Sequence, residues 1–556
     1  MPYAWLIGLA VVVVLPLGYL LLKRRYSRRM RHLLQAQWGT RDALRRPDAD
    51  QQRDIARYWQ AQQEHSPCEG AVDNTTWNDL DMDQLLASLD CSHSIVGSEV
   101  LYAMLRRQNA PLAVLERREV LSVQLCAQED TRLTLQMILS GLGYHAFHGA
   151  TRYLFHPQYQ MPQQPWRFRV LAVLPFTLVI LGFLWNGFFI AAILALMVNM
   201  FVHYRTQAVW EKEMTAIRHL ALVLHGARKL ARAELPGLEA EQQEIRGIVS
   251  QLRFIRLWLQ LFGSEQIHDL DMITPLLKVT FMLDMLSFVS IIKGLQRHGP
   301  DMRRLYELVG ELDAVLSIAQ LRARHGALAR PVFHEELRVE ARGLCHPLVE
   351  RPVPNDLLWN RNMLITGSNA SGKSTFIKAV AINAVLAQTL YVCFADSMAL
   401  CRARVMTSMA IRDSVLAGES YFIAELRSLH RIVDARAQGQ PILCFVDEIL
   451  RGTNTIERIA ASSAVLRALA GGNLLCMTAT HDIELTRILD GLYQNVHFSE
   501  VVDEHGVRFD YLLREGPTRT RNAILLLDQM GYDSALIAEA RDNVRCFEMT
   551  GRWQAE

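Results

Sequence analysis

The sequence lacks closely spaced cysteines. Its nine cysteines are scattered, for example at Cys68, Cys126, Cys444 and Cys546, and no two of them form a C-x-x-C pair. A zinc ribbon needs such pairs, and a small secreted scaffold needs a dense set of cysteines for its disulfides. The pattern therefore argues against both classes and indicates reduced thiols in a cytosolic compartment.

The sequence also lacks an excess of charge of either sign. It carries 59 lysines and arginines against 57 aspartates and glutamates, which gives a net charge of +2. The overall charge therefore neither indicates nor excludes a nucleic-acid partner. At 556 residues the chain is too long for a single hydrophobic core, so two or more domains are expected.

Hydrophobic residues are concentrated in two places, and the first runs from Ala4 to Leu22 without a charge. A helix of this length spans a bilayer. A cleaved signal peptide carries positive charge before its apolar run, whereas no lysine or arginine precedes this one. The basic residues follow it instead, at Lys23, Arg24, Arg25, Arg28, Arg29 and Arg31. The positive-inside rule then places this stretch in the cytoplasm. A patch for nucleic acid or anionic lipid is the alternative interpretation.

The second apolar place is Val170 to Val202, which is too long for one untilted span. The turn-forming residues Trp185-Asn186-Gly187 interrupt it, so we expect a hairpin of two short spans with both flanks in the cytoplasm. Local thinning of the bilayer or a partly re-entrant hairpin is the alternative. A third stretch, Ile273 to Ile292, is predicted to be a core helix, because Lys278 and Asp284 would each cost roughly 2.5–3.5 kcal/mol within a membrane.

The remaining sequence separates into a helical part and an α/β part. Apolar positions recur at helical spacing in residues 302–322, whereas short apolar runs separated by glycine, proline and asparagine follow Arg330. The predicted fold class is α plus α/β, with transmembrane helices and a helical core domain followed by an α/β domain. The predicted domains are a membrane anchor with its basic flank (1–31), a helical domain interrupted by the hairpin (32–329), the α/β domain (330–515) and a helical tail (516–556).

The strongest motif is a phosphate-binding loop of the form G-x-x-x-x-G-K-S. A β-prone run precedes the loop and a helical stretch follows it; the loop comprises Gly367, Ser368, Asn369, Ala370, Ser371, Gly372, Lys373 and Ser374, with Thr375 next to it. Its glycines let backbone N–H groups surround phosphate oxygens, and the helix N-terminus favours negative charge. Lys373 is predicted to reach the β- and γ-phosphates of ATP, and the Ser374 hydroxyl to bind Mg²⁺.

Two further strand patterns end in residues that suit ATP hydrolysis. The apolar run Pro441 to Val446 ends in Asp447 and Glu448. We expect Asp447 to hold Mg²⁺ and Glu448 to orient and deprotonate the attacking water. Another buried-strand pattern delivers His481, predicted to sense the γ-phosphate. The alternatives are that the acidic pair only caps a helix and that the histidine is structural. With the loop, these residues predict that the α/β domain is a P-loop ATPase domain of the ABC type.

With these pieces in order, the last two-fifths of the chain resembles the ATPase domain of the MutS mismatch-repair family. The matching stretches are His346-Pro347-Leu348, Pro354-Asn355-Asp356, the loop Gly367 to Thr375, Ser420 to Glu425, Asp447 to Thr455 and Thr478 to Asp482. The run Asp-Glu-Ile-x-Arg-Gly-Thr-x-Thr is specific to this resemblance, and the L-S-G-G-Q signature of transporter ATPases is absent. Residues 90–106 and 311–317 resemble the family's helical core more thinly.

The resemblance implies a homodimer with composite ATP sites. Ser420 of one subunit would donate to the γ-phosphate bound by the other, with Asn454 and Thr455 at the interface; a helix cap is the alternative role for Ser420. The tail from Asn522 to Ala540 would help to form the dimer. Members of this family act on DNA, so mismatched or branched DNA is the client that the resemblance implies.

The sequence departs from the family in three respects. No segment before residue 78 could form the domain that reads a mismatch, and the hairpin stands where the family has long levers and a DNA clamp. Pro352 stands where the family has an aromatic that stacks on adenine. We therefore expect a multi-pass protein of a bacterial-type inner membrane with its ATPase domain in the cytoplasm. A component of a membrane or envelope complex that does not act on DNA is the alternative function.

Overall fold

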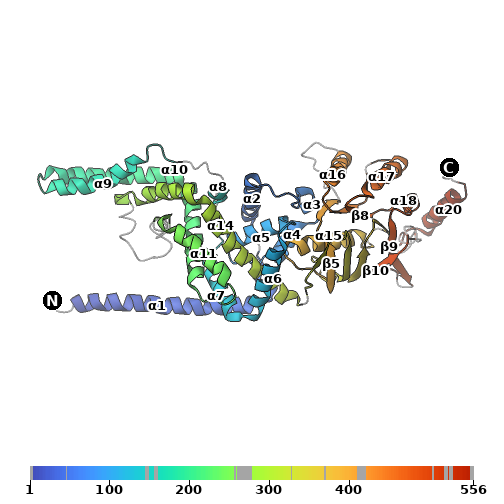
Figure 1. The fold of residues 1–556 in the computed structure, drawn as a ribbon, viewed down its shortest axis with the longest axis horizontal. Helices are drawn as coiled ribbons and strands as arrows, with labels where there is room; N and C mark the ends of the chain where they lie inside the picture. Colours follow the sequence, from blue (N-terminus) through green and yellow to red (C-terminus); the bar gives the residue numbers. More distant parts are fainter. Residues whose placement is uncertain are drawn as a thin grey trace. The chain divides into compact units, whose positions relative to one another are not determined.

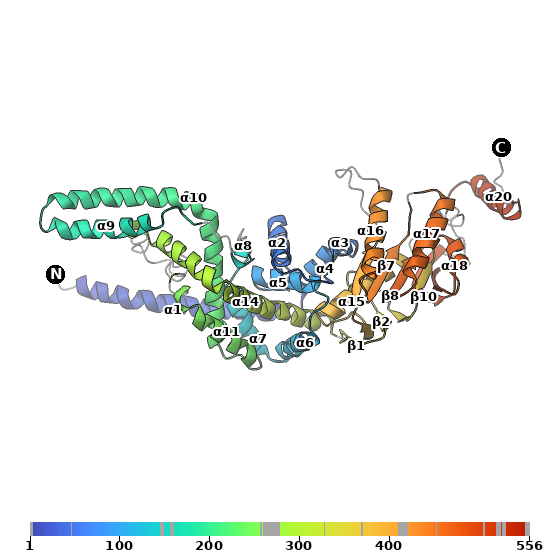
Figure 2. The same ribbon diagram turned by 45° about the horizontal axis from the view of Figure 1, so that its top comes forward.

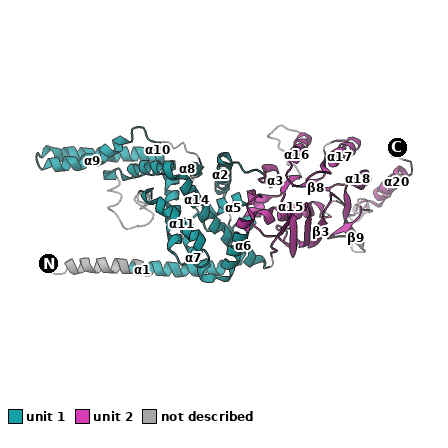
Figure 3. Ribbon diagram, viewed as in Figure 1, with its two compact units in different colours: residues 1–69, 87–104, 116–326 teal, residues 70–86, 105–115, 327–556 magenta. Residues whose placement is uncertain are grey.

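The described part of the chain forms two compact units (Figure 3). The computed structural model describes all residues except 1–3, 46, 145–149, 156–160, 256–257, 259–278, 327, 369–370, 410–420, 452, 504–505, 519–523, 525–526, 528–529 and 551–556. The first, called the helical unit, comprises residues 1–69, 87–104 and 116–326. The second, called the sheet unit, comprises residues 70–86, 105–115 and 327–556. Two short segments of the predicted helical domain thus belong to the sheet unit.

The helical unit is built around a long helix, α14 (Leu283–His325), which is kinked at His298. The predicted helical pattern in residues 302–322 is confirmed, since its apolar positions such as Leu305, Leu312 and Leu316 are all buried. The other helices that contribute to this unit are α1 (Ala4–Gln37), α2 (Ala49–His65), α4 (Met82–Leu89), α5 (Ile95–Arg106), α6 (Leu112–Ala127), α7 (Glu129–Ser140), α8 (Ala150–Phe155), α9 (Trp166–Gly182), α10 (Gly187–Arg232), α11 (Glu239–Gln251) and the 3₁₀ turn η1 (Arg41–Ala43).

Helices α9 and α10 form the predicted hairpin and lie side by side (Figures 1 and 2). Their outer surface is apolar and exposed, as at Phe176, Ile180, Ile190, Ile193 and Phe201. Within the described residues, one helix, α10, is long and apolar enough to cross a membrane by length and composition. It runs well beyond the predicted span and is kinked at Trp210. The first predicted span lies in α1, and the number of spans stays a prediction.

A proline inside the hairpin explains why the side-chain amide of Asn199 is buried there. Pro175 has no N–H, so the carbonyl of Leu171, four residues earlier in α9, has no partner in its own helix. The side chain of Asn199, in α10, donates from Nδ2 to this carbonyl at 2.9 Å and to the carbonyl of Thr280 at 2.8 Å. Asn199 is fully buried. A polar residue is therefore kept between these apolar helices because it satisfies a backbone carbonyl that the proline leaves without a donor.

The sheet unit contains a six-stranded and a four-stranded sheet. The six-stranded sheet has the order β10-β9-β4-β8-β7-β6 and is parallel except at the β10–β9 edge. The strands are β1 (Val332–His334), β2 (Val339–Leu344), β3 (Asn355–Trp359), β4 (Met363–Thr366), β5 (Ser397–Cys401), β6 (Arg404–Ser408), β7 (Ile442–Asp447), β8 (Leu474–Ala479), β9 (Gln494–Asp503) and β10 (Gly506–Glu515). The predicted α/β character of this part is thus confirmed.

Helices cover both faces of the six-stranded sheet. Alternate strand residues such as Met406, Cys444 and Cys476 pack in one apolar cluster with Leu429, Ile432, Leu466 and Leu485 from the helices α16 (Tyr421–Arg436), α17 (Thr455–Leu469) and α18 (Ile483–Ile488). Helix α15 (Lys373–Thr389) contacts β6, β7 and β8 but contributes nothing to that cluster, so it covers the opposite face. The remaining helices are α3 (Asn74–Asp79) and α20 (Ser534–Thr550).

The edge strand β6 is closed by side chains from the two segments that precede the sheet in sequence. The backbone N–H of Val405 donates to Gln108 Oε1 at 2.8 Å, and that of Met409 donates to Asp79 Oδ2 at 3.0 Å. Between them, the Thr407 N–H donates to Thr76 Oγ1 at 3.3 Å, and its hydroxyl to Asp79 at 2.7 Å. An open edge would leave these donors unpaired. Residues 70–86 and 105–115 belong to the sheet unit because they satisfy this edge.

Candidate functional site

The phosphate-binding loop follows β4, as predicted, and leads into α15. Gly367 has φ +149°, and a Cβ there would lie 2.7 Å from the carbonyl oxygen of Phe498. Gly372 has φ +101° and stands immediately before the first helical residue. Both positions therefore require glycine. The start of α15 points its unpaired N–H groups toward the loop, which is the arrangement that binds phosphate. Asn369 and Ala370 lie outside the described residues.

Lys373 holds the loop from within. Its ammonium donates to the carbonyl oxygens of Gly367, at 2.8 Å, and Ser368, at 2.7 Å. The side chain is buried, and this burial lowers the pKa of Lys373 despite the nearby carboxylates of Glu448 and Asp447. A partly desolvated cation gains most from an anionic partner. The ammonium of Lys373 can therefore donate to phosphate oxygens in place of these two neutral carbonyls while it stays at the loop.

Asp447 suits the predicted magnesium role. It ends β7, beside Ala479 at the end of β8, and the carboxyl ends of β4, β7 and β8 meet at one edge of the parallel sheet. Its Oδ1 atom is buried and has no hydrogen-bond partner among the described residues. A buried carboxylate oxygen without a partner is costly unless a cation completes it. Together with the Ser374 hydroxyl at the start of α15, Asp447 is a donor set that fits Mg²⁺.

Glu448 and His481 are brought together as a pair. The distance from His481 Nε2 to Glu448 Oε1 is 2.8 Å, and Arg451 forms an ion pair with the other carboxylate oxygen. Burial would raise the pKa of Glu448, but the hydrogen bond to His481 and the charges of Arg451 and Lys373 outweigh it and lower the pKa. The carboxylate is therefore ionised at neutral pH, the state that a general base requires.

The backbone around Glu448 is strained in a way that fixes this pair. Glu448 has φ +54° and Leu450 has φ +57°, both in the left-handed region that side chains disfavour. The Glu448 N–H donates to the Ala479 carbonyl at 3.0 Å, and the buried carboxylate of Glu425 accepts the Leu450 N–H. These two contacts hold the turn. Glu425 belongs to the stretch Ser420 to Glu425, but Ser420 itself lies outside the described residues.

The end of the Asp447 to Thr455 run has a local structural role. Asn454 caps α17 by accepting the Glu457 N–H at 3.0 Å, and Thr455 is the first residue of that helix. Arg458 then forms a two-pronged ion pair with Asp482, at 3.0 and 2.6 Å, one residue after His481. The geometry of His481 is thus set by α17 as well as by its own strand. The expected place of Asn454 and Thr455 at a dimer interface stays a prediction.

A cavity of about 320 Å³ lies beside the loop, and the sequence alone did not indicate it. Gly372, Thr375 and Phe376 line it from the start of α15, and His346, Pro352 and Tyr511 line it from other elements. Burial, together with the charge of Lys378, lowers the pKa of His346 to about 4, so its imidazole is neutral at pH 7. His346 Nδ1 accepts the Leu348 N–H at 3.1 Å, which leaves the proton on Nε2.

Tyr511 is the residue that sequence reasoning missed. It occupies an irregular part of the β9–β10 pairing with φ +56°, and its ring lies 3.0 Å from the position of a Cβ on Gly372. Asn355 holds this bulge, since its Nδ2 donates to the Tyr511 carbonyl at 2.9 Å and its Oδ1 accepts the Leu513 N–H at 2.8 Å. A side chain held in a left-handed conformation by its neighbours is typical of a functional site. The amide of Asn355 in Pro354-Asn355-Asp356 was the only available signal.

The loop between a parallel strand and a helix, with an acidic pair at the end of a neighbouring strand, defines the class of P-loop domains. Comparison with known sequences then gives the family. Residues 363–548 match the family described as MutS domain V. Residues 363–548 are therefore a MutS-like domain, as the resemblance implied.

Individual relatives are DNA mismatch repair proteins MutS. That of one strain of Thermus thermophilus is 29% identical over 259 residues, which cover 46% of this chain and 31% of that protein. That of Thermus aquaticus is also 29% identical over 259 residues. That of Geobacillus thermodenitrificans is 31% identical over 270 residues, which cover 46% of this chain and 29% of that protein. The match thus spans less than a third of the length of these relatives.

Proposed function

We propose that this protein is a membrane-anchored, MutS-like ATPase. The observation that carries the proposal is the convergence of three elements at one edge of the sheet: the loop with Lys373, the unpartnered Asp447, and the Glu448–His481 pair. A phosphate cradle, a cation ligand and an ionised base are the parts that phosphoryl transfer from ATP to water requires. The family match over residues 363–548 supports the same conclusion.

Each residue has a defined part in this reaction. Lys373 and the N–H groups at the start of α15 bind the β- and γ-phosphates. Asp447 and Ser374 hold Mg²⁺, which supplies charge neutralisation when bound. Glu448 orients a water molecule and accepts its proton, and His481 holds the carboxylate in position at 2.8 Å. Arg451 restrains Glu448 on the other side, through an ion pair with its second carboxylate oxygen.

The cavity beside the loop is the site for the adenine ring. Tyr511 offers the aromatic surface that Pro352 cannot, and the Nε2–H of neutral His346 is a hydrogen-bond donor on the wall of the cavity. Its volume of about 320 Å³ is sufficient for one planar base. The absence of an aromatic at Pro352 therefore does not argue against ATP, because a different element supplies it.

The expected assembly is a homodimer in which Ser420 completes the site of the partner, with the apolar hairpin and α1 in a bacterial-type inner membrane. The exposed apolar surface of α9 and α10 supports the membrane placement, since a soluble surface rarely presents so many large apolar side chains together. DNA is the client that the family implies. The same hairpin favours a second candidate, an ATP-driven component of a membrane or envelope complex that does not act on DNA.

Nucleotide binding by the detergent-solubilised full chain tests the site. Lys373→Ala should abolish binding of a fluorescent ATP analogue, because the buried ammonium is the principal cation at the loop. Lys293→Ala, which removes an exposed lysine of α14, is the matched control and should bind as the native chain does. Equal binding by both variants would contradict the proposal.

A salt titration separates the two candidate clients. Affinity for branched or mismatched DNA should fall steeply with salt concentration if several lysines and arginines contact phosphates. DNA that neither binds in this way nor stimulates ATP hydrolysis would favour the membrane-complex function.

A further inference from the structure

The helical unit contains a second cavity, far in sequence from the phosphate loop. Its volume is about 390 Å³, within the range of pockets that bind small molecules. Its lining includes Leu34 of α1 and Trp38, which follows that helix. The segment after η1 contributes Arg45, and α7 contributes Gln136. Residues 91–93, together with Leu316 and Gln320 of α14, complete its wall, so segments far apart in the sequence converge on one cavity.

Arg45 presents an uncompensated charge to this cavity. Its Nε donates to the Ser92 carbonyl at 2.9 Å, its backbone N–H donates to the Asp90 carbonyl at 2.9 Å, and its guanidinium stacks on the Tyr144 ring with 3.3 Å to the centroid. These contacts fix the side chain but use neither terminal amino group. Within the described residues Arg45 forms no ion pair. Its two terminal groups can therefore form the parallel hydrogen bonds that a carboxylate or phosphate accepts.

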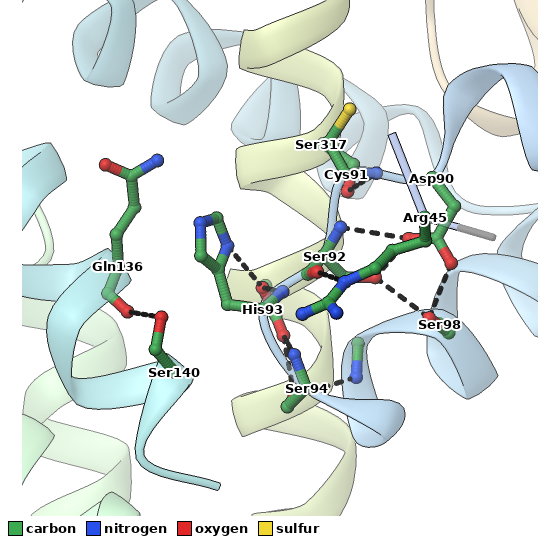
Figure 4. Close-up of polar contacts among 12 residues, drawn as sticks. Arg45, Asp90, Cys91, Ser92, His93, Ser94, Ser98, Gln136, Ser140 and Ser317 are labelled. Atoms are coloured by element: carbon green, nitrogen blue, oxygen red, sulfur yellow. Dashed lines mark hydrogen bonds and ion pairs between the residues drawn. The ribbon is translucent and has the colours of Figure 1, made fainter. Parts of the chain in front are cut away.

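The buried carboxylates behind the cavity do not compensate Arg45. Asp313 accepts hydrogen bonds from the backbone N–H groups of His93 and Ser94, each at 2.8 Å, and from the Ser94 hydroxyl at 2.6 Å. Asp90 accepts hydrogen bonds from Ser92 and Ser98 (Figure 4). Each of these two carboxylates is thus satisfied by its own donors. The exposed carboxylate of Asp42, in η1, also lines the cavity, but among the described residues it forms no ion pair with Arg45.

Gln136 adds a second unused group. The residue is 4% exposed, and its Oε1 atom is buried without a hydrogen-bond partner among the described residues. Ser140 does not serve it, because its hydroxyl donates to the Gln136 backbone carbonyl at 2.7 Å. In Figure 4 the amide of Gln136 and the imidazole of His93 extend from different elements toward the same space. An unsatisfied buried amide is costly, so a ligand that hydrogen-bonds to it gains that energy.

We propose that this cavity binds a small organic anion, through its carboxylate or phosphate group on Arg45 and a hydrogen-bonding group on Gln136. The Trp38 ring, with Arg132 stacked on it at 4.0 Å, and the apolar Leu34 and Leu316 give room for a ring or short chain next to the anionic group. The anion comes from solution rather than from a lipid headgroup. Leu34 lies about 18 Å along α1 beyond Leu22, where the apolar run ends.

Calorimetry on the detergent-solubilised full chain tests the proposal, in a Lys373→Ala background so that the phosphate loop does not bind the probes. The probes are benzoate and phenyl phosphate, with benzyl alcohol as their neutral counterpart. We expect at least one anion to bind and the alcohol not to bind; the tighter of the two anions identifies the group that the site prefers. Arg45→Gln should weaken binding by about tenfold or more, because two charge-assisted hydrogen bonds are lost.

Two further variants decide the result. Gln136→Met keeps the volume and should weaken binding by several-fold, which covers the case in which Arg45→Gln fails to fold. Arg53→Gln removes an exposed arginine of α2 and should bind as the Lys373→Ala parent does. The proposal is overturned if neither anion binds, if benzyl alcohol binds as tightly as benzoate, or if Gln136→Met binds both anions as the parent does.

Discussion

Tyr511 is the residue whose role at the nucleotide site is easiest to isolate. Tyr511→Ala should weaken ATP binding by about tenfold, because stacking of a base on an aromatic ring contributes roughly 1–3 kcal/mol. Tyr511→Phe should bind as the native chain does, since the ring and not the hydroxyl forms the wall of the cavity. Tyr26→Ala, at an exposed tyrosine of α1, is the control. Titration with a fluorescent ATP analogue measures all four proteins; unchanged affinity in Tyr511→Ala would remove Tyr511 from the site.

His346 should make the sheet unit less stable as the pH falls. Its pKa is lowered from 6.5 to about 4 in the folded chain, so between these values the unfolded chain binds more protons than the folded one. This part of the stability is complete above pH 6.5 and is lost as the pH falls toward 4. Between pH 7 and pH 5 the native chain should lose about 1–2 kcal/mol more than His346→Gln.

Thermal unfolding of both proteins at the two pH values measures this difference. A native chain and a variant that lose equal stability between pH 7 and pH 5 would show that His346 titrates normally. A Lys378→Met variant is a useful companion, because the charge of Lys378 is part of the reason for the low pKa of His346.

Some residues of the candidate site could be predicted from the sequence, and others could not. Gly367, Lys373 and Asp447 are predictable because the loop and the strand ends are contiguous in sequence. The roles of Tyr511 and His346 are not, because the cavity that they line is formed by segments far apart in the sequence. Tyr511 depends on a bulge held by Asn355, which lies 156 residues earlier. No periodicity or spacing encodes that contact.

Among the elements, the closed edge of β6 should be sensitive to substitution of Asp79. Asp79→Leu leaves the buried donors of Thr407 and Met409 without an acceptor, and should destabilise the sheet unit by roughly 2–4 kcal/mol. Asp79→Asn keeps an oxygen that accepts both bonds and should cost much less. Chemical denaturation of the two variants measures the difference, and equal midpoints would show that the edge does not depend on this carboxyl oxygen.

In the hairpin, a double-mutant cycle tests the pairing of Asn199 with Pro175. Asn199→Ala should destabilise the α9–α10 pair by about 1–2 kcal/mol, because the carbonyl of Leu171 loses its donor. Pro175→Ala restores an N–H to that carbonyl, so Asn199→Ala should then cost less. Unfolding in detergent micelles measures the cycle. An equal cost in both backgrounds would mean that Asn199 acts only through Thr280.

The sequence predicted the strands around the phosphate-binding loop and the turn of the hairpin, because the patterns that encode them are local. It did not foretell that residues 70–86 and 105–115 join the sheet unit. Their role depends on side chains such as Gln108 that cap β6 almost 300 residues later in the chain. It also could not show that α10 continues past Val202 to Arg232, since the change from apolar to mixed composition does not end a helix.

At the scale of the whole molecule, the chain contains a MutS-like domain and a helical unit that carries an exposed apolar hairpin. The family match covers less than a third of its relatives, so their activity on DNA is carried to this chain as a proposal. The sheet unit itself presents the loop with Lys373, the unpartnered Asp447 and the Glu448–His481 pair, on which the proposed ATPase function rests. The sequence departs from those relatives in the helical unit.

The central claim is that Glu448 is the base of an ATPase, and the rate of ATP hydrolysis by Glu448→Gln tests it most directly. Loss of a general base lowers the rate by about 10²–10⁴-fold, and the amide keeps the size of the side chain, so ATP binding should persist. Phosphate release measured at saturating ATP should therefore fall at least about a hundredfold in Glu448→Gln, with unchanged nucleotide affinity. Hydrolysis at the native rate by this variant would contradict the account.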